Sequence, residues 1–401
     1  MSLPDATFQP SQAAEWGRAR VVLVCEPGTE TLFDLLLPSA ANFMRPFPLA
    51  QAQAEHRAFR RRLEEHDVRV IDLRQALLNG VDMNDNARAR LESWAGQSVR
   101  LDAADLAADD AALAAADLAA SLASLDPAAL VDLVMLAPTI KLTPNPQALD
   151  PTSRFLARYE LAGGSAYYLR DPLFTTRSGV VIGRLRLEKR RRENDLAAYA
   201  LAQLGVTPLY RVQPPGFLEG GDFIPAGDFV LQGQGLLSDE DGIGQCLEQR
   251  VYGHVEVAVV RDPRRQMDEM HLDTYFAFLA PDLCLLCETR LHSANEPEID
   301  IYRPDGDPDR FRYRLVSRLP LSRYLTDKNI RILTFSAEES RNFAPNGLLL
   351  APNHWLGVRQ AGPALFDRLP HHGVNAIPID FSALTGGYGG PHCSTQVVVR
   401  E

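Results

Sequence analysis

The segment Arg18–Cys25 has the sequence RARVVLVC, and this short Val-rich run predicts a buried strand. A turn with the sequence EPGT follows at Glu26–Thr29, and apolar and charged residues then alternate at helical spacing over Ala50–His66. The sequence VRVIDL at Val68–Leu73 predicts a second strand. A strand, a helix and a second strand in this order are typical of α/β proteins, so we expect an α/β fold.

A different composition begins near residue 86 and continues to about residue 145. This part is rich in Ala and Leu, and its leucines recur at roughly helical intervals. Asp126 and Pro127 can start a helix, with Asp as the N-terminal cap and Pro at the first position. Such a composition also occurs in linkers, but the leucine stripe favours packing. We therefore predict an all-helical insertion at 86–145 between two parts of one catalytic α/β domain, 1–85 and 146–401.

Short strands and helices alternate again in the remainder of the chain. Strands are predicted at Gly179–Gly183, Phe229–Gln232, Val255–Val260, Leu283–Leu286, Ile330–Thr334, Leu348–Ala351 and Gln396–Val399. Units of similar length follow one another, which suggests a structural repeat, although no segment repeats closely in sequence.

The composition excludes several classes of function. The chain has 401 residues with 41 basic and 52 acidic side chains, which gives a net charge of −11. Nucleic acids and anionic membranes both need a basic face, so neither is expected as a partner. No apolar run approaches the roughly 18 residues that a membrane-spanning helix needs. The five cysteines are too sparse for a disulfide framework and predict reduced thiols in a cytoplasmic protein.

The C-terminal sequence TGGYGGPHCSTQVVV, which begins at Thr385, contains the candidate nucleophile Cys393. Its four glycines allow the backbone to approach a ligand closely, and the run from Thr395 predicts a strand. Cys393 therefore lies where a loop enters a rigid element, a position that suits a nucleophile; a buried cysteine after a turn is the alternative. His392 is a poor candidate for its base, because neighbouring side chains of an extended chain point to opposite faces.

Three further motifs bring acidic residues and a histidine next to turns. His271 and Asp273 project to one side if the chain is extended there, which suits proton transfer beside a bound cation. Glu219 and Asp222 flank two glycines, and Asp171 precedes a proline after an apolar stretch. Each of these motifs, taken alone, is also compatible with an ordinary turn.

Together these residues predict a site for a cationic substrate. Several carboxylates around a thiol raise its pKa and weaken it as a nucleophile, and a bound cation would offset that effect. A planar guanidinium suits a pair of carboxylates because its fork matches carboxylate geometry. The histidines and cysteines show no spacing typical of a zinc site, and we expect neither a metal nor a cofactor.

Other charged and sulfur-containing segments are interpreted as structural. The basic run at Arg184–Arg192 predicts a solvated helix face. Cys284 and Cys287 lie in an apolar run that predicts a buried strand rather than a metal or redox site. Cys25 and Cys246 are expected to lie in the core.

The order of the motifs resembles the arginine deiminases of the guanidine-modifying superfamily, which also contains amidinotransferases and dimethylarginine hydrolases. The resemblance extends over nearly the whole chain and is carried by EPG at 26–28, EH at 55–56, RDP at 170–172, EGGD at 219–222, HLDT at 271–274 and GGPHC at 389–393. It implies the pentein fold, a five-fold pseudosymmetric α/β propeller. It also implies a small guanidino substrate and a homodimer or homotetramer.

The family mechanism, carried onto the matching positions, implies a role for five residues. Cys393 would attack the guanidinium carbon, and His271 would protonate the departing ammonia and later activate water. Asp171 and Asp273 would hold the guanidinium nitrogens, while Glu219 would support the histidine and the substrate. The covalent thiouronium adduct would then be hydrolysed to a ureido product.

The rest of the expected substrate-binding set departs from the family in part. Arg190 matches a family arginine that binds the α-carboxylate, and Asp222, Tyr168 and Tyr388 complete the set that we expect to bind substrate. A second carboxylate-binding arginine is missing, with Leu237 near its place, and Tyr388 stands where the family often has another arginine. The resemblance therefore implies complete catalytic chemistry with a changed site for the far end of the substrate.

The function implied is hydrolysis of a guanidino C–N bond, with L-arginine and water giving L-citrulline and ammonia as the first candidate. An amidinotransferase, or a deiminase of a modified guanidino compound, is the alternative within the same fold. A non-catalytic arginine-binding sensor is an alternative from another class, and the complete catalytic set argues against it.

Overall fold

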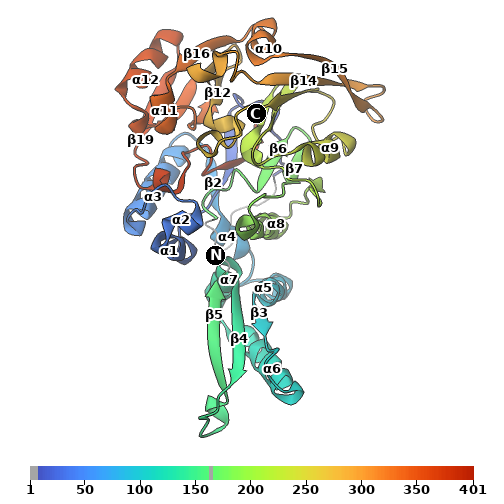
Figure 1. Cartoon of the computed structure of the whole chain (residues 1–401), viewed down its shortest axis with the longest axis vertical. Coiled ribbons are helices and arrows are strands. Elements are labelled where there is room, and N and C mark those ends of the chain that lie inside the picture. Colours follow the sequence, from blue (N-terminus) through green and yellow to red (C-terminus); the bar gives the residue numbers. More distant parts are fainter. Residues whose placement is uncertain (1–7, 162–165) are drawn as a thin grey trace.

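The structure is a computed structural model that describes residues 8–161 and 166–401. Strands in the centre are surrounded by helices, and two segments project from this body (Figure 1). The architecture is therefore mixed α/β, in line with the strand–helix–strand pattern near the N-terminus.

Five of the sheets share one order of strand pairing, in which a strand is antiparallel to one neighbour and parallel to the neighbour that follows it in the chain. They are β20–β1–β2 (Gln396–Arg400, Ala19–Val24, Arg69–Asp72), β6–β7–β8 (Leu173–Thr176, Gly179–Ile182, Tyr210–Arg211), β9–β10–β11 (Phe223–Ala226, Phe229–Gln234, Glu256–Arg261), β12–β13–β16 (Phe276–Ala280, Leu283–Cys287, Arg331–Phe335) and β17–β18–β19 (Leu348–Ala351, His354–Val358, Asn375–Ile379). The first of these sheets joins the two ends of the chain, since β20 pairs with β1.

A helix lies between the two parallel strands of each of these sheets, because parallel strands need a crossover connection. The helices are α3 (Leu49–Glu64), α8 (Arg192–Gln203), α9 (Glu240–Glu248), α10 (Leu321–Asp327) and α12 (Pro363–Arg368). The first of them buries Ala52, Phe59 and Leu63, whose spacing places them on one face of an amphipathic helix. The helix expected over Ala50–His66 is thus confirmed.

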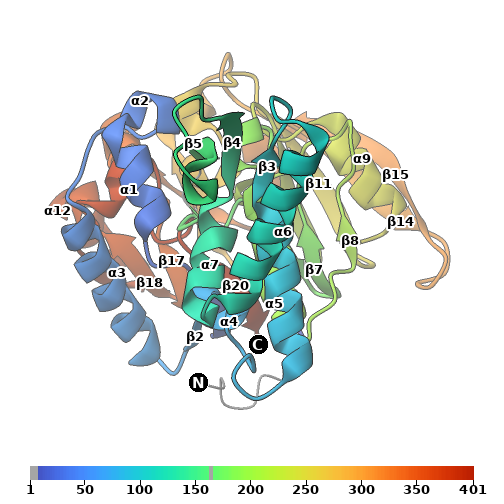
Figure 2. The same cartoon turned by 90° about the horizontal axis from the view of Figure 1, so that it is seen from below.

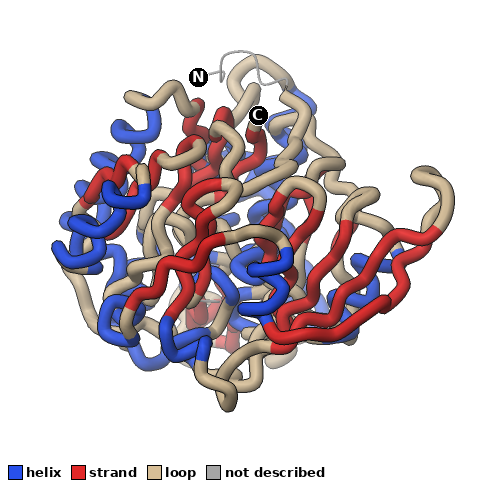
Figure 3. Tube along the Cα trace, turned by 90° about the horizontal axis from the view of Figure 1, so that it is seen from above, coloured by secondary structure: helices blue, strands red, loops and turns tan. Residues whose placement is uncertain are grey.

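One projecting segment is a hairpin of β14 (Glu298–Asp305) and β15 (Arg312–Pro320). It extends the sheet that contains β11, so that this sheet has five strands. Figure 3 shows the hairpin reaching beyond the rest of the molecule, with its loop at the far end.

The second projecting segment contains α5 (Asp85–Ser98), α6 (Ala108–Ser124) and α7 (Pro127–Leu136), together with β3 (Arg100–Asp102), β4 (Pro138–Pro144) and β5 (Phe155–Leu161). Figure 2 shows these elements together in front of the central strands. The prediction of an all-helical insertion is therefore wrong in part, because β3, β4 and β5 form a small sheet. β4 has the sequence PTIKLTP. The conformation of this segment depends on its pairing with β5 more than on the helices that precede it.

The strands predicted from the sequence correspond to β1, β2, β7, β10, β11, β13, β16, β17 and β20. The strands that were not predicted include the antiparallel partners β6, β9 and β12. Each of these is only four or five residues long, and its hairpin partner determines its conformation.

All five cysteines are free and buried. Cys284 and Cys287 lie in the buried strand β13, and Cys25 and Cys246 lie in two of the hydrophobic clusters, as predicted. Cys393 lines a cavity.

No helix in the described ranges is long and apolar enough to cross a membrane.

Candidate active site

Cys393 lies in the loop that leads into β20, and hydrogen bonds from other parts of the chain hold this loop in place. The side-chain oxygen of Asn346 accepts hydrogen bonds from the N–H groups of Gly390 (2.9 Å) and Cys393 (3.2 Å). Glu55 of α3 accepts hydrogen bonds from the backbone of Ala383 and Leu384. The glycine-rich loop is thus fixed at both ends, which places the thiol.

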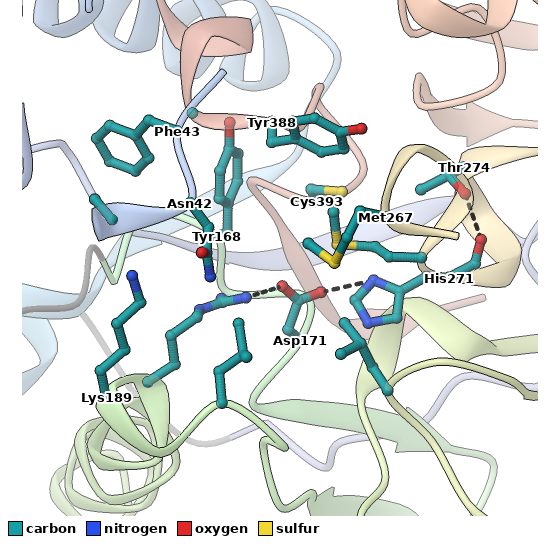
Figure 4. A pocket seen from close by; sticks show the side chains of 16 residues that line it. Asn42, Phe43, Tyr168, Asp171, Lys189, Met267, His271, Thr274, Tyr388 and Cys393 are labelled. Atoms are coloured by element: carbon teal, nitrogen blue, oxygen red, sulfur yellow. Dashed lines mark hydrogen bonds and ion pairs between the residues drawn. The ribbon is translucent and has the colours of Figure 1, made fainter. Parts of the chain in front are cut away.

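The thiol opens into a cavity (Figure 4). Its lining contains the polar or reactive residues Asn42, Tyr168, Asp171, Lys189, Arg190, His271, Thr274, Tyr388 and Cys393 and the apolar residues Ala41, Phe43, Leu187, Leu237, Met267 and Met270. These residues come from segments far apart in the sequence, so that the fold brings the candidate nucleophile, an acid and a histidine to one space.

His271 is buried between two carboxylates. Its Nε2 donates to Glu219 Oε2 at 2.9 Å, and its Nδ1 lies 3.7 Å from Asp171 Oδ1. Burial alone would lower the pKa of His271, but the charge of Asp171 and the hydrogen bond with Glu219 raise it to about 10. The imidazole is therefore protonated at neutral pH and can act as a general acid.

Asp273 lies behind Cys393 and is paired with the histidine next to that cysteine. His392 Nδ1 donates to Asp273 Oδ2 at 2.7 Å, and its Nε2 lies 3.4 Å from Glu15 Oε1. Burial would raise the pKa of Asp273, but the hydrogen bond from His392 and its charge outweigh burial and lower that pKa. Glu15 also pairs with the buried Arg400 at 2.9 Å, so this network is charged and almost closed to solvent.

The thiol of Cys393 is close to the ionised carboxylate of Asp273, with 3.6 Å between Sγ and Oδ2. Burial raises the pKa of Cys393 well above that of a free cysteine, and the charges of Asp273 and Asp171 add to this effect. Without a cation in the cavity, the thiolate is therefore disfavoured, as expected from the cluster of acids in the sequence.

Of the residues predicted to bind substrate, Arg190, Tyr168 and Tyr388 line the cavity, whereas Asp222 does not. Asp222 accepts hydrogen bonds from the backbone N–H of Leu272 (2.9 Å) and from the Ser238 hydroxyl (2.6 Å). Burial raises the pKa of Asp222 to about 6. Its contacts fix the backbone just after His271, so the structure places Asp222 behind the catalytic histidine.

Arg190 reaches the cavity, but carboxylates surround its guanidinium. Its Nε and one terminal nitrogen donate to Glu193 at 2.9 and 2.8 Å, and its other terminal nitrogen donates to Asp171 at 2.9 Å. The prediction of a solvated helix face for Arg184–Arg192 is therefore wrong for Arg190. Residues Glu188–Arg190 form a short 3-10 turn that directs Arg190 inward, before α8 begins.

Asp171, Glu219 and His271 present one ligand atom each within 4.8 Å of one another, a composition that can hold a metal ion. The environment opposes this role, because a protonated His271 has no lone pair to offer and the Arg190 cation already contacts Asp171. The cluster suits proton transfer better than metal binding.

Asn346, Glu15 and Glu193 belong to this site but are not predicted from the sequence. Asn346 and Glu15 act through partners more than 15 residues away. Glu193 acts through Arg190, which lies in the run interpreted as a solvated helix face. No local motif therefore marks any of the three. His392 is predicted to be a poor base for Cys393, and it does not line the cavity that Cys393 lines. Its position next to Cys393 could nevertheless have marked it as part of the site, since it binds the carboxylate nearest to the thiol.

Two solved structures share the mixed α/β fold of this chain. DDAH from Pseudomonas aeruginosa, solved with citrulline, aligns with a TM-score of 0.54 at 15% identity, covering 94% of this chain and 99% of that one. SxtG, an amidinotransferase from Microseira wollei, aligns with a TM-score of 0.55 at 14% identity, covering 98% and 97% of the two chains. At these identities the similarity shows a shared fold.

Comparison of sequences is more specific. Arginine deiminases from Halobacterium salinarum and Listeria welshimeri are both 23% identical to this chain, covering 100% and 97% of it and 98% of each relative. The arginine deiminase family model matches residues 42–400, which include every candidate catalytic residue. The chain therefore belongs to the arginine deiminase family, and it is an enzyme that hydrolyses C–N bonds of guanidino compounds.

Proposed function

We propose that this enzyme converts L-arginine and water to L-citrulline and ammonia through a covalent intermediate on Cys393. The observation that supports this most directly is that Cys393, Asp171 and the protonated His271 line one cavity. Family membership supports the same reaction class. The chemistry requires no metal or cofactor, since thiol, acid and water suffice.

The acidic residues are proposed to hold the guanidinium group. Oδ1 of Asp171 and Oδ1 of Asp273 are buried and have no hydrogen-bond partner among the described residues. Buried acceptors without a partner carry a desolvation cost, which guanidinium N–H donors would remove. Asp171 lines the cavity, whereas Asp273 does not and lies behind Cys393, with its Oδ2 3.6 Å from the sulfur. Contacts of the cation with both carboxylates would orient its carbon toward the thiol.

Binding of the cation would also prepare the nucleophile. A guanidinium between Asp171 and Asp273 neutralises the two charges that, after burial, raise the pKa of Cys393. Thiolate formation is then favoured only when substrate is present. An empty site would keep the thiol protonated and less open to oxidation.

The chemical steps follow with atoms and charges balanced. The Cys393 thiolate adds to the guanidinium carbon and forms a C–S bond. His271 gives its proton to a terminal nitrogen, the C–N bond breaks and ammonia leaves, so that a thiouronium adduct remains. Neutral His271 then accepts a proton from water as the water oxygen attacks the same carbon. The C–S bond breaks, the remaining hydroxyl proton passes to the departing sulfur, and the ureido product and the Cys393 thiol are released. Glu219 would keep the imidazole in position throughout.

We also propose the finer architecture and the assembly of the protein. The repeated order of pairing in five sheets supports a five-fold pseudosymmetric propeller. We propose 1–85 and 146–401 as one catalytic domain, with 86–145 as the insertion, and a homodimer or homotetramer as the assembly.

The proposal is tested by measuring ammonia and citrulline released from L-arginine by the wild type and by Cys393→Ala. Turnover that is lost in the variant supports the proposal. Product that forms only when an amine is added, with no citrulline in water, would instead indicate an amidinotransferase. Binding of arginine without turnover, together with no labelling of Cys393 by a haloacetamidine, would indicate a sensor.

A further inference from the structure

The carboxylate end of an arginine-like substrate needs a cation in this cavity, and Arg190 is poorly placed to supply one. Its guanidinium donates through all three of its nitrogens, to Glu193 and to Asp171. A substrate carboxylate beside it would compete with these two carboxyl groups for the same donors, at a cost in a buried space. The nearby lining residues Leu187 and Leu237 cannot compensate for this cost.

Lys189, the residue before Arg190, lines the same cavity and has a different environment. It is half-buried, and its ammonium donates to the carbonyl oxygen of Ala40. Within the described ranges no ion pair of this side chain is found, so its charge is not matched by a contacting carboxylate. One of the three ammonium protons is used, which leaves two donors for a ligand.

Figure 4 shows where this cation lies relative to the reacting groups. Lys189 and His271 lie on opposite sides of Asp171, and Cys393 lies above it. Asn42, which follows α2 (Pro38–Ala41), lies on the same side of the cavity as Lys189. A ligand with its guanidinium at Asp171 and Cys393 therefore has this side of the cavity for its other end.

The apolar surroundings make a single cation effective there. Phe43 and Leu187 are part of the lining, and such side chains exclude water and strengthen a charge–charge contact. Burial lowers the pKa of Lys189, while the carboxylate of Asp34 opposes that shift. A bound carboxylate would act in the same direction as Asp34 and stabilise the charged ammonium.

We propose that Lys189 binds the α-carboxylate of the substrate, with the side-chain amide of Asn42 as a second donor. This assignment rests on the proposed hydrolysis of L-arginine and names the specificity determinant for its amino-acid end. Arg190 then serves to position Asp171. The lysine would thus replace the second carboxylate-binding arginine of the family, near whose place this sequence has Leu237.

The test compares L-arginine with agmatine, the same guanidine without the carboxylate, as a substrate or as a competitive inhibitor. Lys189→Met keeps the length of the side chain and removes its charge. We expect kcat/KM for L-arginine to fall about 10- to 100-fold, mostly through KM, because one charge-assisted contact is lost. The KM or Ki of agmatine should change less than threefold, and Lys189→Arg should restore most of the selectivity.

Arg184→Met is the matched control, since it removes a charge from the same basic run at a residue that stacks on Phe217 outside the cavity lining. It should leave both ligands unaffected. The assignment is overturned if Lys189→Met changes both ligands equally or neither, or if only Arg190→Gln abolishes the preference for the carboxylate. Absence of turnover of any guanidine, with Cys393 unlabelled, would instead reject the proposed function itself. Thermal melts establish that each variant is folded.

Discussion

Two buried histidines flank the candidate nucleophile, and each lies between two carboxylates. His271 contacts Glu219 and Asp171, while His392 contacts Asp273 and Glu15. The two pairs have nearly the same composition and similar distances. The first histidine lines the substrate cavity, however, and the second does not.

This difference separates a catalytic role from a positioning role. His271 can exchange a proton with a bound ligand, because its ring borders the cavity. His392 does not border that cavity, and its Nε2 lies 3.4 Å from Glu15, which also pairs with Arg400. Its hydrogen bond to Asp273 lowers the pKa of that carboxyl beside Cys393, so we expect a positioning role for His392.

The largest effect is expected at the residue between the two networks. Cys393→Ala should reduce ammonia release at least about 1000-fold, since no other group in the cavity can form the covalent adduct. The control is Cys246→Ala, which alters a buried cysteine that lies in a different hydrophobic cluster and does not line the cavity. Retained turnover in the first variant would show that the reaction does not use a covalent adduct on this thiol.

Replacement of the catalytic histidine should have the next largest effect. His271→Asn removes the general acid, and kcat should fall by about 100- to 10,000-fold. Labelling of Cys393 by an amidine probe should persist, because the thiol and Asp273 remain. Turnover close to that of the wild type would show that another group, or water, protonates the leaving ammonia.

A smaller effect is expected for the second histidine. His392→Asn weakens a charged hydrogen bond to Asp273, which corresponds to a loss of about 10- to 100-fold in kcat/KM. The shape of the pH–rate profile should stay the same, since His392 exchanges no proton with substrate. If this variant were as inactive as His271→Asn and also had an altered profile, the distinction between the two histidines would be wrong.

The smallest measurable difference concerns stability and pH. The folded pKa of His271 is raised to about 10, above the value of about 6.5 for an unfolded histidine. Its stabilisation is therefore complete below about pH 6.5 and is lost as the pH rises through about 10. Denaturant unfolding of the wild type and His271→Gln should differ most near pH 6 and converge by pH 10. A difference that grows with pH would contradict this pKa direction.

Much of the site could be predicted because its chemistry is concentrated in short motifs. Asp171, Glu219, His271 and Cys393 each stand beside glycines or turns, and their order along the chain carried the family resemblance. The strands were predicted where apolar runs are continuous, as in β1 and β13. The hairpin partners and the sheet of the projecting segment were not, since short strands depend on what they pair with.

The sequence by itself determined the α/β class, the likeness to arginine deiminases and the identity of the candidate catalytic residues, because these depend on local periodicity and residue type. Only the tertiary structure decided which cation or hydrogen-bond donor contacts each buried carboxylate. It matched Arg190 with Glu193 and Asp171, left Lys189 in the cavity without an ion pair among the described residues, and turned His392 toward Asp273. The physical reason is that charge compensation depends on distances of about 3 Å between segments that are remote in sequence.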